Sequence, residues 1–291
     1  MNNIITLDNI LETLVENKAY HIPGKNLYSL LKKLARLEIE KIYKDNAGFF
    51  KFKWLGEIKL PYYSMGNVSS INLFDLDELI IFCFYWLNKF NYHKVIDIGA
   101  NIGLHSIILA KLGYQVDAYE PEQDHFLNLE KNLALNNVTV KSKQVAVSNK
   151  MGEATFIKVL GNTTSSHIDG SKPNPYGDLE KVKVFLEPFN DIIKEADLIK
   201  MDVEGHEADI LLSTAEDSWN KTDAIIEIGS EQNATKIYDH FQNMRVNLFS
   251  QKTGWKKVRT IVEMPMSYKE GSLFLSAKEV MPWRNSSVSL S

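Results

Sequence analysis

The chain has a single cysteine, no excess of positive charge and no long apolar run, and each of these shortages excludes some classes of protein. Cys83 is the only cysteine among 291 residues, so an intrachain disulfide is impossible. It lies in the apolar run 79–87, and we expect a buried, unreactive thiol in a reducing compartment. This run falls short of the roughly 18 apolar residues that a membrane-spanning helix needs, so no membrane span is predicted.

The charge balance argues against a nucleic-acid partner. Lys and Arg number 33 against 37 Asp and Glu, a formal net charge of −4. Binding along a phosphate backbone needs clustered basic residues, and no NPPY-like element is present. A small anionic substrate is not excluded. The first residues carry no basic leader before an apolar block, so we expect a cytoplasmic protein; the sequence gives no oligomeric state.

The first part of the chain, residues 1–92, predicts an N-terminal α+β cap. Apolar residues recur at helical spacing over 8–17, 25–44 and 75–90. Between them, FFKFKW alternates apolar and basic residues, Gly56 interrupts the pattern and EIKLPYY follows, as in a short hairpin. Such a cap has either a structural role or a role in shaping a substrate pocket.

From Lys94 onward, short apolar runs alternate with helical patterns. The strand-like runs are KVIDIGA, QVDAYEP, VTVKSKQVAVS, DLIKMDVEG, DAIIEIG, RVNLFSQK and GSLFLSA. This alternation predicts an α/β domain over residues 93–280 with a doubly wound, mostly parallel, seven-stranded sheet. Only a loop separates the last two runs, so the final strand should be antiparallel. GEATFIKV and KVKVFLEP predict two extra strands around a polar insert, and residues 281–291 form a polar tail.

A glycine-rich turn follows the first of these strands. Its pattern, D-x-G-x-N-x-G, runs from Asp97 through Gly99 and Asn101 to Gly103. In doubly wound sheets, ligands bind beyond the carboxyl ends of the strands, and glycines there let the backbone approach a ligand. An acidic residue at this strand end would repel a pyrophosphate, whereas it suits a cationic ligand such as the amino-acid part of S-adenosylmethionine.

A second acidic residue stands at the tip of the second strand. Glu120 ends QVDAYE, 17 positions after Gly103. A carboxylate at this place accepts hydrogen bonds from the vicinal hydroxyls of a ribose. Together the two acidic positions favour an adenosyl sulfonium over a dinucleotide; a solvated loop carboxylate is the alternative reading of Glu120.

The motifs VIDIGANIGLHS, YEPE, ALNN, QVAVS and KMDVEGHE, in this order, resemble the FkbM family of methyltransferases, a branch of the class I methyltransferase fold. The resemblance covers about residues 94–230 and implies an O-methyltransferase that uses S-adenosylmethionine on a hydroxyl of a sugar, glycan or small polar metabolite. By position, it implies that the methionine end of the donor lies at the turn from Asp97 to Gly103, the ribose at Glu120 and the adenine near Gln144 or Ala146. It also implies that Asp202 and Glu204 lie across the site from the donor, on the side where the acceptor binds.

Catalysis on a hydroxyl calls for a general base. The candidates at the tips of the later strands are His206, Asp202, Glu204 and Glu227. His206 is the first choice because its ordinary pKa lies near neutrality, although a structural histidine is an equal alternative. Asp202 and Glu204, two apart in the expected strand, should share a face, where Asp202 contacts the methionine amine or orients the acceptor.

Neither a metal nor a role for the insert is fixed by the sequence. Asp202, Glu204 and Glu227 offer oxygen ligands but lack a recognisable ligand spacing, so no metal site is predicted. The insert 161–177 is polar and loop-like, either a lid that contacts the acceptor or a mobile surface loop.

Three other functions share this fold. A nucleotide-dependent oxidoreductase would bind NADH instead of the sulfonium donor. A methyltransferase for nitrogen or for a macromolecule would differ only in its acceptor. A scaffold without chemistry would have lost the donor residues, yet Asp97, Gly99, Gly103 and Glu120 are all present.

Overall fold

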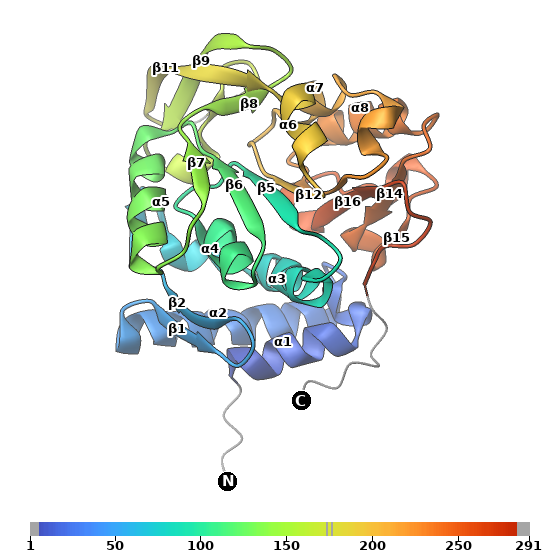
Figure 1. Cartoon of the computed structure of the whole chain (residues 1–291). Helices are drawn as coiled ribbons and strands as arrows, with labels where there is room; N and C mark the ends of the chain where they lie inside the picture. The colour runs from blue at the N-terminus through green and yellow to red at the C-terminus, as the bar shows by residue number, and fades with distance from the viewer. Residues whose placement is uncertain (1–5, 173, 176, 284–291) are drawn as a thin grey trace.

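The computed structural model describes residues 6–172, 174–175 and 177–283, and Figure 1 shows the arrangement of its elements. The expected tail 281–291 lies outside this range from residue 284 onward. None of the helices in the described ranges has both the length and the apolar character needed to cross a bilayer.

The N-terminal cap contains the predicted helices and hairpin. Its elements are α1 (Leu7–Glu16), α2 (Asn26–Asn46), β1 (Phe49–Phe52), β2 (Gly56–Lys59), β3 (Ser64–Met65), β4 (Val68–Ser69) and α3 (Leu76–Asn88). Side chains cap two of the helices: Thr6 accepts a hydrogen bond from the Asn9 amide, and Asp75 from the Leu76 amide. β1 and β2 pair antiparallel, as predicted for a hairpin.

The main sheet has eight strands in the order β15-β14-β16-β13-β12-β5-β6-β7. Their bounds are β5 Lys94–Ile98, β6 Gln115–Tyr119, β7 Lys141–Lys143, β12 Leu198–Met201, β13 Asp223–Glu227, β14 Asn247–Ser250, β15 Lys256–Lys257 and β16 Ser272–Ser276. Seven are the predicted strands, and the two-residue β15 adds an eighth at the edge. β16 runs antiparallel to both β13 and β14, which confirms the expected final strand.

Helices cover both faces of the main sheet. They are α4 (Leu104–Lys111), α5 (Gln123–Leu135), α6 (Phe189–Ile192), α7 (Glu207–Leu211) and α8 (Glu231–Phe241). Short 3-10 helices are η1 (Lys18–His21), η2 (Ser70–Leu73), η3 (Thr163–Ser165), η4 (Ile193–Glu195), η5 (Glu216–Trp219), η6 (Gln251–Thr253), η7 (Ile261–Glu263) and η8 (Tyr268–Glu270). The sequence pattern predicts that the helices corresponding to α7 and α8 continue to about residues 214 and 244. In the structure, α7 ends at Leu211 and α8 at Phe241.

Alternation along the strands divides the core into two layers. Val95 packs with the cap helices and α4, whereas Ile96 and Ile98 pack on the other face with α7 and α8. Cys83 is fully buried in the first layer, as expected. Because the cap shares this layer with the main sheet, it packs directly on the domain that the motifs define.

The segment predicted as one third strand is divided between two sheets. β7 pairs with β6 in the main sheet, whereas β8 (Ala146–Ser148) pairs with β11 (Leu179–Pro188). β11 also pairs with β9 (Gly152–Val159), and β9 with the short β10 (His167–Ile168). This second sheet, in the order β10-β9-β11-β8, lies beyond the carboxyl ends of the main strands in Figure 1.

Candidate active site

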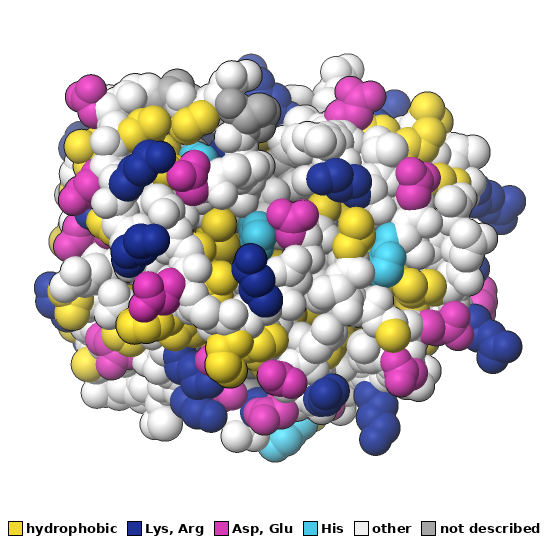
Figure 2. Space-filling model, turned by 90° about the horizontal axis from the view of Figure 1, so that it is seen from above, with side chains coloured by type: hydrophobic (Ala, Val, Ile, Leu, Met, Phe, Trp, Pro, Cys, Tyr) yellow, Lys and Arg dark blue, Asp and Glu magenta, His cyan; other side chains and the backbone are white. Residues whose placement is uncertain are grey.

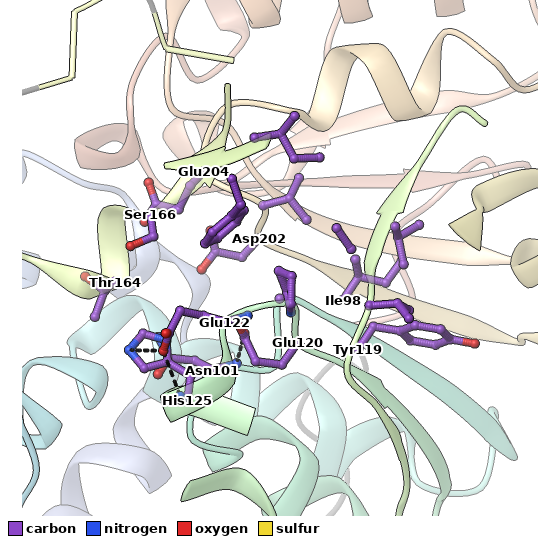
Figure 3. A pocket seen from close by; sticks show the side chains of 18 of the residues that line it. Ile98, Asn101, Tyr119, Glu120, Glu122, His125, Thr164, Ser166, Asp202 and Glu204 are labelled. Atoms are coloured by element: carbon purple, nitrogen blue, oxygen red, sulfur yellow. Dashed lines mark hydrogen bonds and ion pairs between the residues drawn. The ribbon is translucent and has the colours of Figure 1, made fainter. Parts of the chain in front are cut away.

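A cavity opens between the tips of β5, β6 and β12 and the second sheet. Of the residues predicted to bind donor or acceptor, Gly99, Asn101, Glu120, Ala146, Asp202 and Glu204 line it. In Figure 3, Asp202 and Glu204 lie on one side of this space, and Glu120 and Asn101 on the other. The parallel register of β5 with β6 and with β12 brings these loops to one edge of the sheet.

The glycine turn depends on close contact with the neighbouring strand tip. Gly99 has φ 77°, and a Cβ atom built on it would lie 1.8 Å from the carbonyl oxygen of Asp202. Only glycine fits this place, because both the backbone conformation and the space exclude a side chain. Gly103 has a related role at the start of α4, where a Cβ would meet Leu129 at 2.5 Å.

Glu120 ties the turn to the tip of β6. Its Oε2 atom accepts a hydrogen bond from the Asn101 amide at 2.8 Å, and its Oε1 atom accepts one from the Glu122 amide at 2.8 Å. Asn101 itself has a left-handed backbone, φ 52°, at this point. Burial raises the pKa of the Glu120 carboxyl to about 7, against the lowering effect of the two amides.

Asp97 lies beneath the turn instead of facing the cavity. Its side chain is fully buried, and its Oδ2 atom accepts a hydrogen bond from the Ser106 hydroxyl at 2.6 Å. The Oδ1 atom has no hydrogen-bond partner among the described residues and lies 3.8 Å from the Lys200 ammonium. Among the described residues, the Oδ1 atom of Asp97 is therefore stabilised by the charge of Lys200 and not by a hydrogen bond.

Lys200, which the sequence motifs do not indicate as a site residue, places a buried ammonium group between Asp97 and Asp202. The register of β12 against β5 sets it beside Asp97 on the same face, and its Nζ atom also lies 3.8 Å from Asp202 Oδ2. It donates a 3.4 Å hydrogen bond to the Gly99 carbonyl. Burial alone would lower the pKa of the ammonium, but Asp202 and Asp97 raise it above its ordinary value, so Lys200 is charged.

The structure differs from the sequence prediction in the loop after β12. β12 ends at Met201, so Asp202 and Glu204 lie in a loop and not within a strand as expected. Glu204 has a left-handed backbone, φ 55°, and Gly205 follows at φ 106°. Strained backbone of this kind is found mainly where the surrounding structure fixes it, often at functional sites.

Glu204 contacts the insert across the cavity edge. Its Oε2 atom pairs with the ammonium of Lys172. Burial and repulsion from Asp202 raise the pKa of the Glu204 carboxyl to about 7, although Lys172 acts in the opposite direction. A carboxyl with this pKa exchanges a proton near neutral pH, as a general base must.

His206 faces away from the cavity. Its Nε2 atom lies 2.9 Å from the Ser148 hydroxyl, and its Nδ1 atom 3.2 Å from the Ser171 hydroxyl. Burial lowers the pKa of the imidazole, so the neutral form predominates at neutral pH. Both ring nitrogens are thus engaged by serines of the second sheet and the insert, an arrangement that matches the alternative reading of a structural histidine.

Three other predicted residues do not line the cavity. Gln144 is exposed, and its neighbours Val145, Ala146 and Val147 take part in the lining. Gly103 begins α4. Glu227 ends β13 behind Asp202, where burial and repulsion from Asp202 raise the pKa of its carboxyl well above the ordinary value. Among the described residues, no group of three or more His, Cys, Asp or Glu is arranged to hold a metal ion.

The insert forms part of the roof of the cavity, in η3 and β10. Thr163, Thr164, Ser166 and Ile168 line the cavity from this side. The hydroxyl of Thr163 lies 2.9 Å from the Nε2 atom of His125 on α5, and Lys158 of β9 pairs with Glu122 at 2.8 Å. His125 and Glu122 were not indicated by the sequence as site residues; the only hint was YEPE, in which Glu122 caps α5.

Comparison with known proteins identifies the family. A profile of the methyltransferase FkbM domain matches residues 97–254. Methyltransferase sdnD of Sordaria araneosa is 26% identical over 195 residues, which cover 55% of this chain and 75% of that protein. Methyltransferase 1 of Beauveria bassiana (strain ARSEF 2860) is 23% identical over 155 residues, 45% of this chain and 62% of the relative.

Solved structures of lower similarity include methyltransferases. Monomeric WbdD aligns with a TM-score of 0.37 and 11% identity, over 69% of this chain and 40% of that one. The Thermus thermophilus 16S rRNA N2 G1207 methyltransferase RsmC, solved with AdoMet and guanosine, aligns with a TM-score of 0.36 and 14% identity, over 76% and 47%. Because the FkbM domain match spans more than half of the 291 residues and carries the motifs that line the cavity, the chain belongs to the FkbM family and is an S-adenosylmethionine-dependent methyltransferase.

Proposed function

We propose that this chain binds S-adenosylmethionine in the cavity between the β5, β6 and β12 tips and methylates a hydroxyl of a sugar, a glycan or a small polar metabolite. The observation that carries the proposal is the placement of acidic side chains around a small cavity with the buried ammonium of Lys200 behind it. Glu120, Asp202 and Glu204 line the cavity, while Lys200 is buried beneath it.

The charge of this lining fits the donor. A bound S-adenosylmethionine would supply a methyl group activated by its sulfonium. The sulfonium and the amino group are cationic, so both are favoured beside Asp202 and over the buried Asp97, whose Oδ1 atom lacks a hydrogen bond. A pyrophosphate would be repelled by the same carboxylates. This difference supports the sulfonium donor over a dinucleotide.

The other half of the cavity suits an adenosine. Each Glu120 oxygen accepts one backbone amide and retains a second lone pair, enough to accept a ribose hydroxyl. Apolar side chains line the space beside it, namely Tyr119, Val145, Ala146, Val147, Phe156 and Ile168. A flat purine ring gains from such a lining through the hydrophobic effect.

The proton of the acceptor hydroxyl needs a base at the cavity. Of the four predicted candidates, Glu204 fits this task best, because it lines the cavity and its pKa is about 7. Asp202 is then free to orient the acceptor or hold the donor amine. His206 is engaged by two serines and Glu227 stands behind Asp202, so we assign them supporting positions.

The roof favours a polar acceptor. Thr163, Thr164 and Ser166 of the insert line the cavity, and hydroxyl side chains of this kind recognise sugar hydroxyls. We further propose that the insert is the element that selects the acceptor, and that the protein acts in a reducing compartment such as the cytoplasm, as its single buried Cys83 would allow.

The proposal is tested in two steps. Calorimetry with S-adenosylmethionine and with NADH should show binding of the first alone; binding of NADH alone would overturn the donor assignment. A transfer assay with labelled donor, with and without EDTA, should then compare sugar nucleotides, glycans, small hydroxylated metabolites, amines and structured RNA. Labelling of a hydroxylated small molecule supports the acceptor class, whereas labelling of RNA or an amine alone would overturn it.

A further inference from the structure

The outer face of α2 is apolar although it faces solvent. Leu27, Leu30 and Leu37 are 52%, 52% and 61% exposed, and they lie on the side of the helix opposite to its buried residues Tyr28 and Ile39. Together with the half-buried Leu34, these leucines are spaced by three and four residues along a 21-residue helix. Large apolar side chains gathered in this way mark a surface that something covers.

The segment around this helix has more basic than acidic residues. Residues 18–59 contain ten Lys or Arg and four Asp or Glu, a formal charge of +6, which leaves −10 on the rest of a chain of net charge −4. On α2 itself, Lys33 and Lys44 are exposed beside the leucine stripe. Two of its three acidic residues are paired, Glu40 with Arg36 at 2.6 Å and Glu38 with Lys41 at 3.8 Å, and the third, Asp45, is exposed.

This basic and apolar face is distant from the cavity. In Figure 1, α2 lies with α1 and the β1–β2 hairpin at the end of the molecule away from β8, β9 and β11. The face seen from above in Figure 2 instead mixes acidic and basic side chains. A partner on α2 would therefore leave the mouth of the cavity open to water.

We propose that the α2 face docks on the surface of a bilayer that contains anionic phospholipids. An interfacial helix of this type places its leucines in the boundary of the acyl chains, while flanking lysines reach the phosphate groups. A groove beside the stripe is lined by Lys32, Lys33 and Arg36, and it offers room for a head group. Asp75 also lines this groove, where its carboxylate pairs with Lys32 at 2.5 Å. A lipid surface of this kind would contact both the leucines and the lysines of the α2 face.

A second copy of the chain or a nucleic acid would use only the apolar or only the cationic part of the α2 face. In a symmetric dimer through α2, two helices with five Lys or Arg and three Asp or Glu each would meet, so like charges would be brought together. Along a nucleic acid, the lysines would meet phosphates, but the exposed leucines would stay in water. The lipid surface is the occupant that the charge and the leucines favour together.

The test is sedimentation of the full chain with vesicles of phosphatidylcholine alone or mixed with phosphatidylglycerol. We expect binding to the mixed vesicles only, weakened by salt. Leu30→Ser with Leu37→Ser should weaken it at least about tenfold. Lys33→Glu with Lys44→Glu should weaken it more than about 25-fold, at about fivefold for each lysine neutralised. Matched controls are Val262→Ser and Lys221→Glu with Lys236→Glu, exposed positions on η7, before β13 and on α8.

Each of the following results either supports or overturns the proposal that α2 docks on an anionic bilayer. Loss of binding in both α2 variants with full binding in both controls supports it, provided that donor affinity, the sign of an intact fold, is unchanged. Absence of wild-type binding to mixed vesicles, or binding that survives the leucine change, overturns it. A dimer in sedimentation velocity that Leu30→Ser with Leu37→Ser dissociates would identify a second copy as the occupant, and RNA binding without vesicle binding would identify a nucleic acid; both overturn the lipid proposal.

Discussion

The carbonyl oxygen of Asp202 occupies the space that a side chain at Gly99 would need. Because a Cβ there would lie 1.8 Å from this oxygen, and because Gly99 has φ 77°, Gly99→Ala must push the β5 and β12 tips apart. We expect a loss of about 3 kcal/mol in the free energy of unfolding, from left-handed strain and overpacking together. Donor affinity, measured by calorimetry, should fall as the cavity opens.

Gly113 provides the matched control for this change. It has φ 93°, yet a Cβ built on it meets nothing within 4 Å. Gly113→Ala should therefore cost only the left-handed strain, about 1 kcal/mol, and leave donor affinity unchanged. Equal losses in the two variants, measured by chemical denaturation, would show that contact with Asp202 does not constrain the turn.

Glu120 makes stability and donor binding depend on pH in opposite directions. Its carboxyl has a pKa of about 7 in the folded chain against an ordinary 4.5, so the folded state holds a proton that the unfolded chain releases. Stability should fall as pH rises from 4.5 to about 7, whereas affinity for a cationic donor should rise over the same window.

Glu120→Gln tests this dependence. This change should remove part of the pH dependence of stability and part of the pH dependence of donor affinity. It should also weaken donor binding, since one of the two backbone amides loses its acceptor. Glu204, whose pKa is also about 7, should retain the rest of the stability slope. Unfolding curves and calorimetry across pH supply the measurement; an unchanged pH dependence of donor affinity would exclude Glu120 from the donor site.

The fold could be predicted where local pattern decides structure. Apolar runs and helical spacing indicated the strands of the main sheet, because each such segment must bury its apolar face whatever its neighbours. The division of 138–148 into β7 and β8 could not be predicted in this way. It results from pairing with β11, about forty residues later, and such long-range pairing leaves no local pattern.

The site could be predicted in part for a related reason. Strand ends of a parallel sheet meet at one edge, so Gly99, Glu120 and Asp202 were expected together and are found together. The orientation of His206 and the burial of Asp97 depend on side-chain packing, which spacing does not reveal. Lys200 could have been found, since a lysine within a buried apolar strand needs carboxylate partners.

Lys200 should stabilise the two carboxylates beside it. Lys200→Met leaves Asp97, which is fully buried, without a counter-charge, and we expect a loss of about 3–5 kcal/mol in the free energy of unfolding. Asp97→Asn should then cost less in the Lys200→Met background than in the wild type. A double-mutant cycle by denaturation measures this coupling, and strict additivity would mean that the 3.8 Å contact carries no energy.

Glu204 and His206 differ in what their removal should do to turnover. Glu204 lines the cavity with a pKa of about 7 in the free chain, so kcat/KM should rise with pH through this value, and Glu204→Gln should abolish that limb while donor affinity is retained. A loss of about 10²–10⁴-fold is typical for a general base. His206→Ala, which breaks contacts with Ser148 and Ser171, should instead lower stability and alter kcat little at saturating donor and acceptor. The reverse pattern, a pH-dependent loss of kcat confined to His206→Ala, would return the role of base to the histidine.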